Sequence, residues 1–442
     1  MKFPVRLEAL ILGLGLCLAC FLAGAAVLNY RVFPYSLLAF GFEAVESVDR
    51  NIIQPLFDDP LASGEYYYPN RFPKQGVLKH DPAKAYEGVT LFAAADAPTA
   101  YLITMEGHEL HRWTMPFSAV WDSPPHIEVP LDDRFISFRK TYLYPNGDLL
   151  AIYEAPGHWP YAYGLVKIDK DSKLLWSYAD LANHDLDVGP DGRIYTLVHH
   201  VRRDLKGPKG FDHHTVVDDV AVVLSPDGQE EKRVSIGEAL ARSAYATVLL
   251  QAEGKDIMHA NSIRLATAAI AASHPFIREG ELLISLRNLS TIVALDPASE
   301  TVTWAMQGSW LHQHSAEFAG NGAVGLFDNE GNIGGGGRSR IAEFNPETGG
   351  ILWQFNGSDS DPFHSNNRGE LQYLPNGNIL ITESNSSRIL EVTRDHEIVW
   401  EYVNEHQVDG MLPATFWGTR YDPANLPFLS LNTQTSALES AQ

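Results

Sequence analysis

Four of the 17 histidines share one position in a repeated pattern. His184, His314 and His364 follow a tryptophan by 8, 10 and 11 residues, and His259 enters an apolar stretch at the same relative place. A neutral imidazole is a nucleophile and a general base near neutral pH, so grouped histidines can move protons or form a covalent intermediate. The shared register predicts that these side chains meet at one site. The alternative is that each is a hydrogen-bonded polar residue at a strand start.

Arginine and asparagine side chains recur near the ends of the same apolar stretches. They lie in segments 285–288, 327–329 and 337–340, and they are Arg287, Asn288, Asn329, Arg338 and Arg340. The planar guanidinium fork suits an oxyanion, and burying it without an anionic partner is unfavourable. We therefore expect a local anion site. The alternative is that the arginines pair with nearby carboxylates, Asp328 among them, and only tie repeats together.

A repeat of several tens of residues carries these side chains. Each copy has an alternating strand, a turn, a strand ending in tryptophan, a strand entering a turn such as Pro-Asn-Gly, and a last apolar strand. Four short strands of this kind match one blade of a β-propeller. Full copies begin at Ala100, Gly164, Val222, Ile292 and Ile341, and Ile389–Trp400 is a half-copy that needs a strand from elsewhere. The sequence thus predicts an all-β fold, a single six-bladed propeller over residues 71–425.

A propeller accounts for the length of the chain and for the placement of the histidines. One closed ring accommodates about 350 residues, so the chain needs no second core. The first strand of each blade lines the central channel, and the four histidines lie at or just before these strands. Two stacked β-sandwiches are the alternative, but they do not predict a tryptophan repeated at one strand end.

The N-terminus has a different pattern. Residues 9–28 form a charge-free run, which at about 1.5 Å per helical residue spans a hydrocarbon core of about 30 Å. Lys2 and Arg6 precede it, which predicts a cytoplasmic segment 1–8, a transmembrane anchor 9–28 and an exported remainder. A signal peptide cleaved near Ala25 is the alternative. Residues 29–70 are expected to form a juxtamembrane segment, with an amphipathic helix at Phe40–Phe57.

Composition excludes several classes of protein. With 45% hydrophobic and 11% aromatic residues the chain can bury a sizeable core, which excludes a disordered protein. The net charge of −22 repels a phosphate backbone, so nucleic acid is not an expected partner. Cys17 and Cys20 lie in the apolar run and are expected to face lipid, not to bind zinc or form a redox pair. Residues 426–442 are expected to form a polar tail.

Several short motifs, taken in order, resemble the arylsulfotransferase (aryl-sulfate sulfotransferase) family. They are Met258–Ile263, Ile284–Asn288, Gln313-His314, Leu326–Asn329, Ser339-Arg340 and Gln372–Glu383. The resemblance covers roughly Gly88 to Tyr402. The chain departs from the family after His314, where Ser315 and Ala316 replace a polar side chain that helps some members to bind sulfate.

The resemblance implies a propeller in the bacterial periplasm that moves a sulfuryl group from a phenolic sulfate ester to a phenol. In the family a histidine on the axis attacks sulfur and forms a sulfohistidine, without a nucleotide cofactor, and no metal is expected. The catalytic candidates are His259, His314 and His364, with the nucleophile among them left open. Together with the register, the resemblance also implies a set of substrate-binding residues, namely Asn261, Arg287, Asn288, Asn329, Arg338, Arg340 and His184.

Two other functions are compatible with a propeller. A non-catalytic propeller that binds a ligand or scaffolds an envelope complex would use the same histidines as structural residues. A pyrroloquinoline-quinone or metal-dependent oxidoreductase would need a vicinal disulfide or a calcium-binding acidic cluster, and neither accompanies the tryptophan repeat. The expected partners are small aryl sulfates and phenols. The N-terminal helix adds the membrane, which implies an inner-membrane protein with its propeller in the periplasm.

Overall fold

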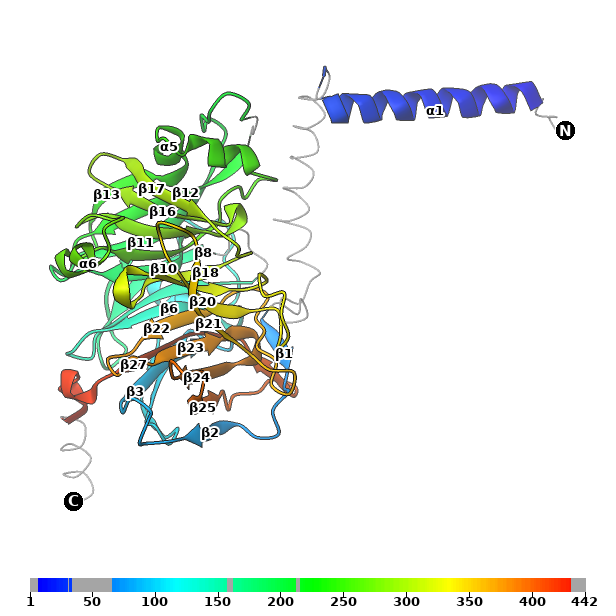
Figure 1. The fold of residues 1–442 in the computed structure, drawn as a ribbon. Coiled ribbons are helices and arrows are strands. Elements are labelled where there is room, and N and C mark those ends of the chain that lie inside the picture. The colour runs from blue at the N-terminus through cyan, green and yellow to red at the C-terminus, as the bar shows by residue number, and fades with distance from the viewer. Residues whose placement is uncertain (1–6, 31, 34–65, 157–161, 212–214, 431–442) are drawn as a thin grey trace. The chain divides into compact units, whose positions relative to one another are not determined.

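The computed structural model describes residues 7–30, 32–33, 66–156, 162–211 and 215–430. The chain forms two units, Met1–Ala62 and Ser63–Gln442. In the first unit, helix α1 (Leu7–Tyr30) contains the charge-free run 9–28 (Figure 1). Within the described residues, no helix combines the length and the hydropathy needed to cross a membrane. The helix expected at Phe40–Phe57 lies outside the described residues.

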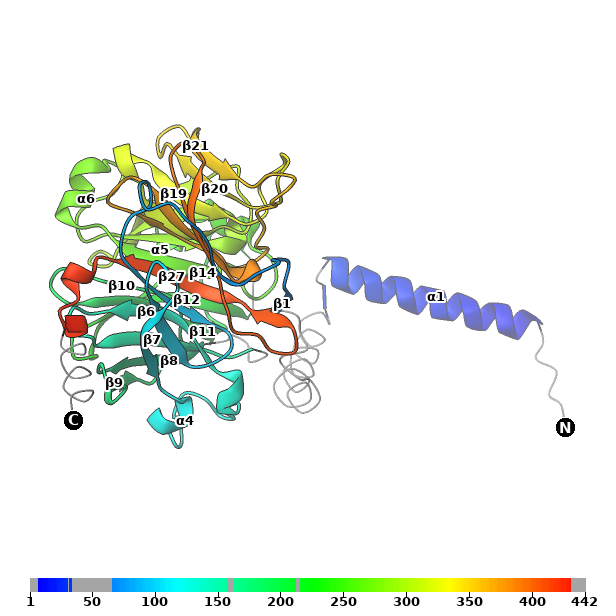
Figure 2. The same cartoon turned by 90° about the horizontal axis from the view of Figure 1, so that it is seen from below.

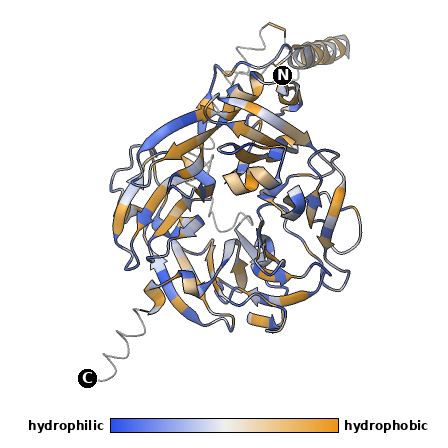
Figure 3. Ribbon diagram, turned by 60° about the vertical axis from the view of Figure 1, so that its left-hand side comes forward, coloured by the Kyte–Doolittle hydropathy of each residue, from blue (hydrophilic) through white to orange (hydrophobic). Residues whose placement is uncertain are grey.

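The second unit contains a ring of six antiparallel sheets, which confirms the predicted all-β six-bladed propeller (Figures 1 and 3). Five blades are continuous in sequence, and in each the strands follow one another from the axis outward. Blade 2 has β6 (Ser137–Leu143), β7 (Leu149–Glu154), β8 (Ala162–Ile168) and β9 (Leu174–Tyr178) (Figure 2). Blade 3 has β10 (Ala182–Val188), β11 (Ile194–Arg202), β12 (Val216–Leu224) and β13 (Glu230–Ser235). Blade 4 has β14 (Ala260–Leu265), β15 (Leu282–Leu286), β16 (Thr291–Asp296) and β17 (Thr301–Gln307).

Blades 5 and 6 follow the same order. Blade 5 has β18 (His314–Phe318), β19 (Val324–Asp328), β20 (Arg340–Phe344) and β21 (Ile351–Asn356). Blade 6 has β22 (Glu370–Tyr373), β23 (Ile379–Glu383), β24 (Arg388–Val392) and β25 (Ile398–Val403), and β2 (Gly76–His80) adds a fifth strand at its rim. Short helices lie between strands, namely α4 (Phe117–Val120), α5 (Ile236–Ala241) and α6 (Ala268–Ser273).

Blade 1 closes the ring by joining the two ends of the propeller. Its innermost strand is the late β27 (Thr415–Tyr421), which pairs with β3 (Val89–Ala94), followed by β4 (Thr99–Ile103) and β5 (Glu109–Thr114) (Figure 1). A second seam joins β1 (Tyr67–Pro69) to β26 (Met411–Pro413). The prediction that Ile389–Trp400 lacks a strand is wrong, because these residues belong to a complete blade 6. A repeat unit that is defined by its tryptophan contains strands of two neighbouring blades. The blade that is completed by a strand from elsewhere in the chain is therefore blade 1, which takes β27.

The repeated tryptophans join neighbouring blades. Trp113 on the outermost strand of blade 1 donates a hydrogen bond to Gly147 O, in the turn between β6 and β7 of blade 2, at 2.9 Å. Trp400 of blade 6 does the same to Met105 O of blade 1 at 2.9 Å. Gly147 has φ of +90°, a conformation that glycine adopts without strain, which accounts for Pro-Asn-Gly at this turn. Buried apolar clusters between adjacent blades form the core; one unites Leu197 of blade 3 with Ile284 of blade 4.

Candidate functional site

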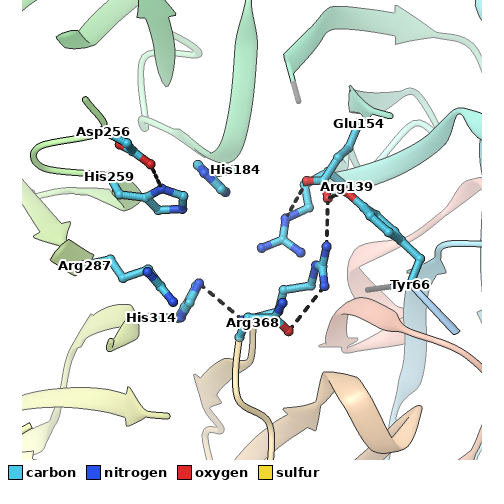
Figure 4. Close-up of a pocket in the computed structure, with 10 residues that line it drawn as sticks. Tyr66, Arg139, Glu154, His184, Asp256, His259, Arg287, His314 and Arg368 are labelled. Carbon is cyan, nitrogen blue, oxygen red and sulfur yellow. Dashed lines mark hydrogen bonds and ion pairs between the residues drawn. The ribbon is translucent and has the colours of Figure 1, made fainter. Parts of the chain in front are cut away.

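A polar cavity lies where the innermost strands enter the ring. Its volume is about 240 Å³. Histidines, arginines and carboxylates from five blades line it, together with residues of the connecting segments (Figure 4); they are Tyr66, Arg139, Glu154, His184, Asp256, His259, Arg287, His314, Asn367 and Arg368. The structure therefore brings together four of the predicted site residues, His184, His259, Arg287 and His314.

Bulges in the innermost strands position several of these side chains. The pairing shifts register between residues 138 and 140 of β6, 183 and 186 of β10, and 314 and 317 of β18. Arg139 and His184 lie inside such bulges, and His314 begins one. A bulge leaves a residue unpaired and changes the direction of its side chain. His184 and His259 also have φ of 54°, which is uncommon for a non-glycine residue and is typical of strained functional sites.

His259 is oriented by a carboxylate. Its Nδ1 lies 2.5 Å from Asp256 Oδ2, and the opposite edge of the ring faces the cavity (Figure 4). Burial by itself would raise the pKa of Asp256, but the attraction and hydrogen bond of His259, together with His199 and Arg287, lower that pKa. When the neutral ring donates its Nδ1–H to the carboxylate, the lone pair is on Nε2. This arrangement suits a nucleophile or a general base.

His314 is held in one tautomer by neighbours on both ring nitrogens. Nδ1 lies 2.8 Å from Asn329 Oδ1, whose amide group donates in turn to Ser365 O, and Nε2 accepts the backbone N–H of Arg368 at 3.3 Å. Burial, reinforced by the positive charge of Arg287, holds the pKa of His314 well below its ordinary value. His314 is therefore neutral at neutral pH.

His184 occupies the space between the two walls of the cavity. Its ring centroid lies 4.8 Å from that of His259. Its Nδ1 is buried and has no hydrogen-bond partner among the described residues. Burial, followed by the charges of His259 and Arg139, holds the pKa of His184 well below its ordinary value. His184 is thus a neutral side chain with an unused polar atom.

Arg287 contributes positive charge on the same wall as His259. It forms no ion pair with a carboxylate of the described residues, and its guanidinium donates to Asn288 Oδ1 at 2.8 Å. Asn288 also donates to Asp256 O at 2.6 Å and so links the arginine to the Asp256 loop. Burial lowers the pKa of Arg287, partly countered by Asp256 and Glu330. An anion in the cavity would relieve this unfavourable burial.

Two further arginines occupy the facing wall. Arg139 Nε lies 3.3 Å from Glu154 Oε2, and Arg368 Nη2 lies 3.4 Å from Glu154 Oε1 (Figure 4). Tyr66 donates its hydroxyl to the same carboxylate at 2.8 Å. One carboxylate thus serves two guanidinium groups. Among the lining residues three arginines face two carboxylates, so the cavity is locally positive in a chain of net charge −22.

The structure places the other predicted residues outside the cavity lining. Asn261 and Asn329 are buried behind it, where Asn261 donates to Gln313 O at 2.8 Å and Asn329 holds His314. Arg340 pairs with Asp328 at 2.8 Å, which is the carboxylate pairing considered as the alternative, but both residues lie within blade 5, so this ion pair does not tie blades together. Arg338 has an exposed side chain near Glu330.

His364 also lies apart from the cavity lining. It is half-buried in the segment before β22, and its backbone N–H donates to Glu383 Oε1 at 2.9 Å. Burial lowers the pKa of its ring. The structure therefore does not group His364 with His259 and His314.

Counting only histidines missed Arg139, Arg368, Glu154, Asp256 and Tyr66. A signal existed for Arg139, because it lies 7 residues before Asn146 of its Pro-Asn-Gly turn, as His184 and His314 do before theirs. Arg368 lies 8 residues before the equivalent Asn376. The same register therefore carries a cationic residue in blade 2, and the position one residue earlier carries one in blade 6. The described residues contain no group of histidine, cysteine and carboxylate side chains that could hold a metal ion.

The structure shows a six-bladed propeller with a cavity lined by histidines and arginines from several blades. The family model described as arylsulfotransferase (ASST) matches residues 142–405, more than half of the chain. The chain belongs to the arylsulfotransferase family, as the motifs predicted. Comparison with curated protein sequences gives no match.

Several solved structures are similar to this chain at low sequence identity. A protein of unknown function from Bacteroides caccae is 12% identical with a TM-score of 0.48, covering 74% of this chain and 99% of its own. A streptogramin B lyase is 13% identical with a TM-score of 0.41, covering 80% and 95%. Virginiamycin B lyase from Staphylococcus aureus is 11% identical with a TM-score of 0.38, covering 78% and 86%. Similarity at this level carries no information about the activity of this chain.

Proposed function

We propose that this protein is an aryl-sulfate sulfotransferase that moves a sulfuryl group from a phenolic sulfate ester to a phenolic acceptor through a sulfohistidine. The observation that carries the proposal is the Asp256–His259 pair beside Arg287, in a cavity with an excess of positive charge. Such a site combines an oriented nucleophile with donors for the oxygens of an anionic group. Family membership supports the same reaction class.

The residues have distinct roles in this mechanism. The Nε2 lone pair of His259 attacks sulfur, the S–O bond to the aryl group breaks, and the electron pair leaves on the phenolate oxygen. Asp256 accepts the hydrogen bond of the Nδ1–H group, which stays protonated, and stabilises the positive charge that forms on the ring. Arg287 holds the sulfuryl oxygens, and His314 lines the cavity beside them. In the second half-reaction an acceptor phenolate attacks sulfur and the N–S electron pair returns to Nε2.

This mechanism distinguishes among the three predicted catalytic histidines. His259 is the nucleophile because a carboxylate orients it and its other edge faces the cavity. His314 is not the nucleophile, because its Nε2 already accepts a backbone N–H and its Nδ1 contacts Asn329, and we assign it to shaping the cavity wall. We assign His364 no role in the transfer, since it does not line the cavity.

The proposal includes an exported propeller anchored by the run 9–28, which rests on the sequence and on family membership. Protease treatment of spheroplasts should digest the propeller while the cytoplasmic membrane remains sealed. Protection of the propeller until the membrane is opened would contradict export.

The test of the activity uses the full-length purified chain with 4-nitrophenyl sulfate as donor and phenol as acceptor. We expect nitrophenolate release that depends on phenol, and a loss of at least about 1,000-fold in His259→Asn. The matched control is His108→Asn, which removes an exposed histidine from blade 1. Folding of each variant is verified by circular dichroism. Absence of transfer across a panel of aryl sulfates, or full activity in His259→Asn, would overturn the proposal.

A further inference from the structure

In the wall opposite His259, one carboxylate contacts two buried arginines. Arg139 and Arg368 both contact Glu154, at 3.3 and 3.4 Å, and no second carboxylate of the described residues lines this wall. The relative solvent exposure is 4% for Arg139 and 8% for Arg368. A buried cation of this kind is stable only with further anionic or polar partners. An anion in the cavity would therefore add a partner for Arg139, which shares its carboxylate with Arg368.

Arg139 has an unused donor within this wall. Its Nη1 is buried and has no hydrogen-bond partner among the described residues. In Figure 4 the guanidinium points toward the centre of the cavity, across from His259. Unsatisfied buried donors are rare in native proteins and mark sites where a ligand or an ion completes the network.

The two guanidinium groups are held in place by aromatic rings. Arg368 lies over the ring of Tyr66 at 4.4 Å, and both arginines lie over the ring of Phe416, at 5.1 Å for Arg139 and 5.2 Å for Arg368. Tyr66 also donates to Glu154, which fixes the carboxylate between the arginines. The donors are therefore preorganised, which is the condition for strong stabilisation of developing charge.

The histidines do not offer a proton to a departing phenolate. His184 and His314 are neutral at neutral pH, because burial and nearby arginines lower their pKa values. His314 also uses its one proton in the bond to Asn329. The phenolate that leaves sulfur would thus remain anionic in the cavity, and stabilisation must come from another group.

We infer that Arg139 and Arg368 form a phenolate subsite, which stabilises the departing oxygen of the donor and then the attacking oxygen of the acceptor. The inference rests on the proposed sulfotransferase function and specifies its leaving-group side. When the S–O bond breaks, its electron pair and negative charge go to the phenolate oxygen beside Arg139. The phenolate is released and takes its proton from water. The acceptor enters as a phenolate, after losing its proton to solvent, and the N–S bond breaks as its S–O bond forms.

Leaving-group dependence tests this subsite in the full-length chain. Phenol is a weaker acid than 4-nitrophenol, so its phenolate carries more localised charge and depends more on the arginines. We expect Arg139→Gln to lower kcat/KM by about 100-fold for phenyl sulfate and by less than about 10-fold for 4-nitrophenyl sulfate. Arg139→Lys should recover part of the loss, because it restores the charge without the second donor.

The control is Arg420→Gln, which removes an equally buried arginine paired with Glu391 and outside the cavity lining. If Arg420→Gln changes kcat/KM at all, the change should be the same for both donors. Equal losses for both donors in Arg139→Gln would overturn the phenolate subsite and indicate binding of the sulfuryl group or a structural role. Failure of the wild-type chain on every donor would instead overturn the proposed function itself.

Discussion

Residues at or near the start of the innermost strands form two layers around the axis. The two layers differ in how completely their charged side chains are paired. The cavity layer takes one residue from each of several blades, namely Arg139, His184, His259, His314 and Arg368. The layer beside it takes residues one to five positions further along, namely Lys140, Asp185, Arg264, Glu317 and Glu370. We call this second set the ion-pair layer.

In the ion-pair layer the charges neutralise one another by direct contact. Asp185 lies 2.8 Å from Lys140 Nζ and 2.5 Å from Arg264 Nη1. Arg264 Nη2 also lies 2.5 Å from Glu317 Oε1. In the cavity layer Arg139 has an unused donor, and Arg287, which lines the same cavity from the end of β15, lacks an ion pair within the described residues. Paired charges hold the blades in register, and incompletely paired charges leave a place for a ligand.

The largest expected effect is the loss of stability when the ion-pair layer is broken. Arg264→Met leaves Asp185 and Glu317 without their guanidinium partner, so we expect the free energy of unfolding to fall by about 3–5 kcal/mol. Arg287→Met, which removes an arginine from the cavity wall, should change it by less than about 1 kcal/mol or raise it. Urea unfolding followed by tryptophan fluorescence measures both.

The same pair of variants separates stability from activity. Arg287→Met should lower sulfuryl transfer by about 100-fold or more although its fold is intact, because the sulfuryl oxygens lose a charged donor. If Arg264→Met were as stable as the wild type, or Arg287→Met as unstable as Arg264→Met, the distinction between the two layers would be wrong.

A smaller effect is expected at the carboxylate that orients the proposed nucleophile. Asp256→Asn should lower kcat by about 100-fold, because the amide no longer holds the Nδ1–H tautomer of His259. Asp256 is a positioning residue, so its test needs a readout of the ring. Nitrogen NMR of labelled histidine should show the tautomer changed in Asp256→Asn and unchanged in Asp191→Asn, an exposed turn variant. An unchanged tautomer together with full activity would exclude this role.

The fold was more accessible from the sequence than the site. Tryptophan and Pro-Asn-Gly spacings are local signals, and they predicted the blades; Trp113, Trp353 and Trp400 each donate to a turn of the next blade. The closing pair β27–β3 joins residues more than 300 positions apart, which a repeat count does not reveal. Such pairings depend on the whole ring.

Within the site, the shared spacing identified the histidines but not the residues that contact them. Asp256 reaches His259 from a loop that bridges to Val217, and Tyr66 reaches Glu154 from 88 residues away. Neither contact follows from strand periodicity. Arg139 was predictable, because it shares the spacing of His184, and only the restriction to histidine hid it.

The smallest expected effect is a difference between the layers in the pH dependence of stability. Burial, with the nearby Asp185 and against Lys140 and Arg264, raises the pKa of Glu370 to about 7. Between about 4.5 and 7 the folded chain therefore holds a proton that the unfolded chain has lost, so this group's contribution to stability falls as pH rises. His184 and His314 act in the opposite sense, because their lowered pKa values make their contribution fall as pH drops below about 6.5.

Glu370→Gln should remove the fall in stability with rising pH. It should keep the fall in stability with dropping pH that His184 and His314 cause. Relative to the wild type, we expect little change in the free energy of unfolding near pH 4.5 and a gain of about 1–3 kcal/mol at pH 8, where the buried charge is absent. Urea unfolding between pH 4.5 and 8 measures this difference, with Glu106→Gln on the exposed surface as control. A variant curve parallel to that of the wild type would mean that Glu370 stays ionised throughout. In that case the cations of the ion-pair layer stabilise the ionised form of Glu370. The charges of this layer would then be paired more completely than the distances between them indicate.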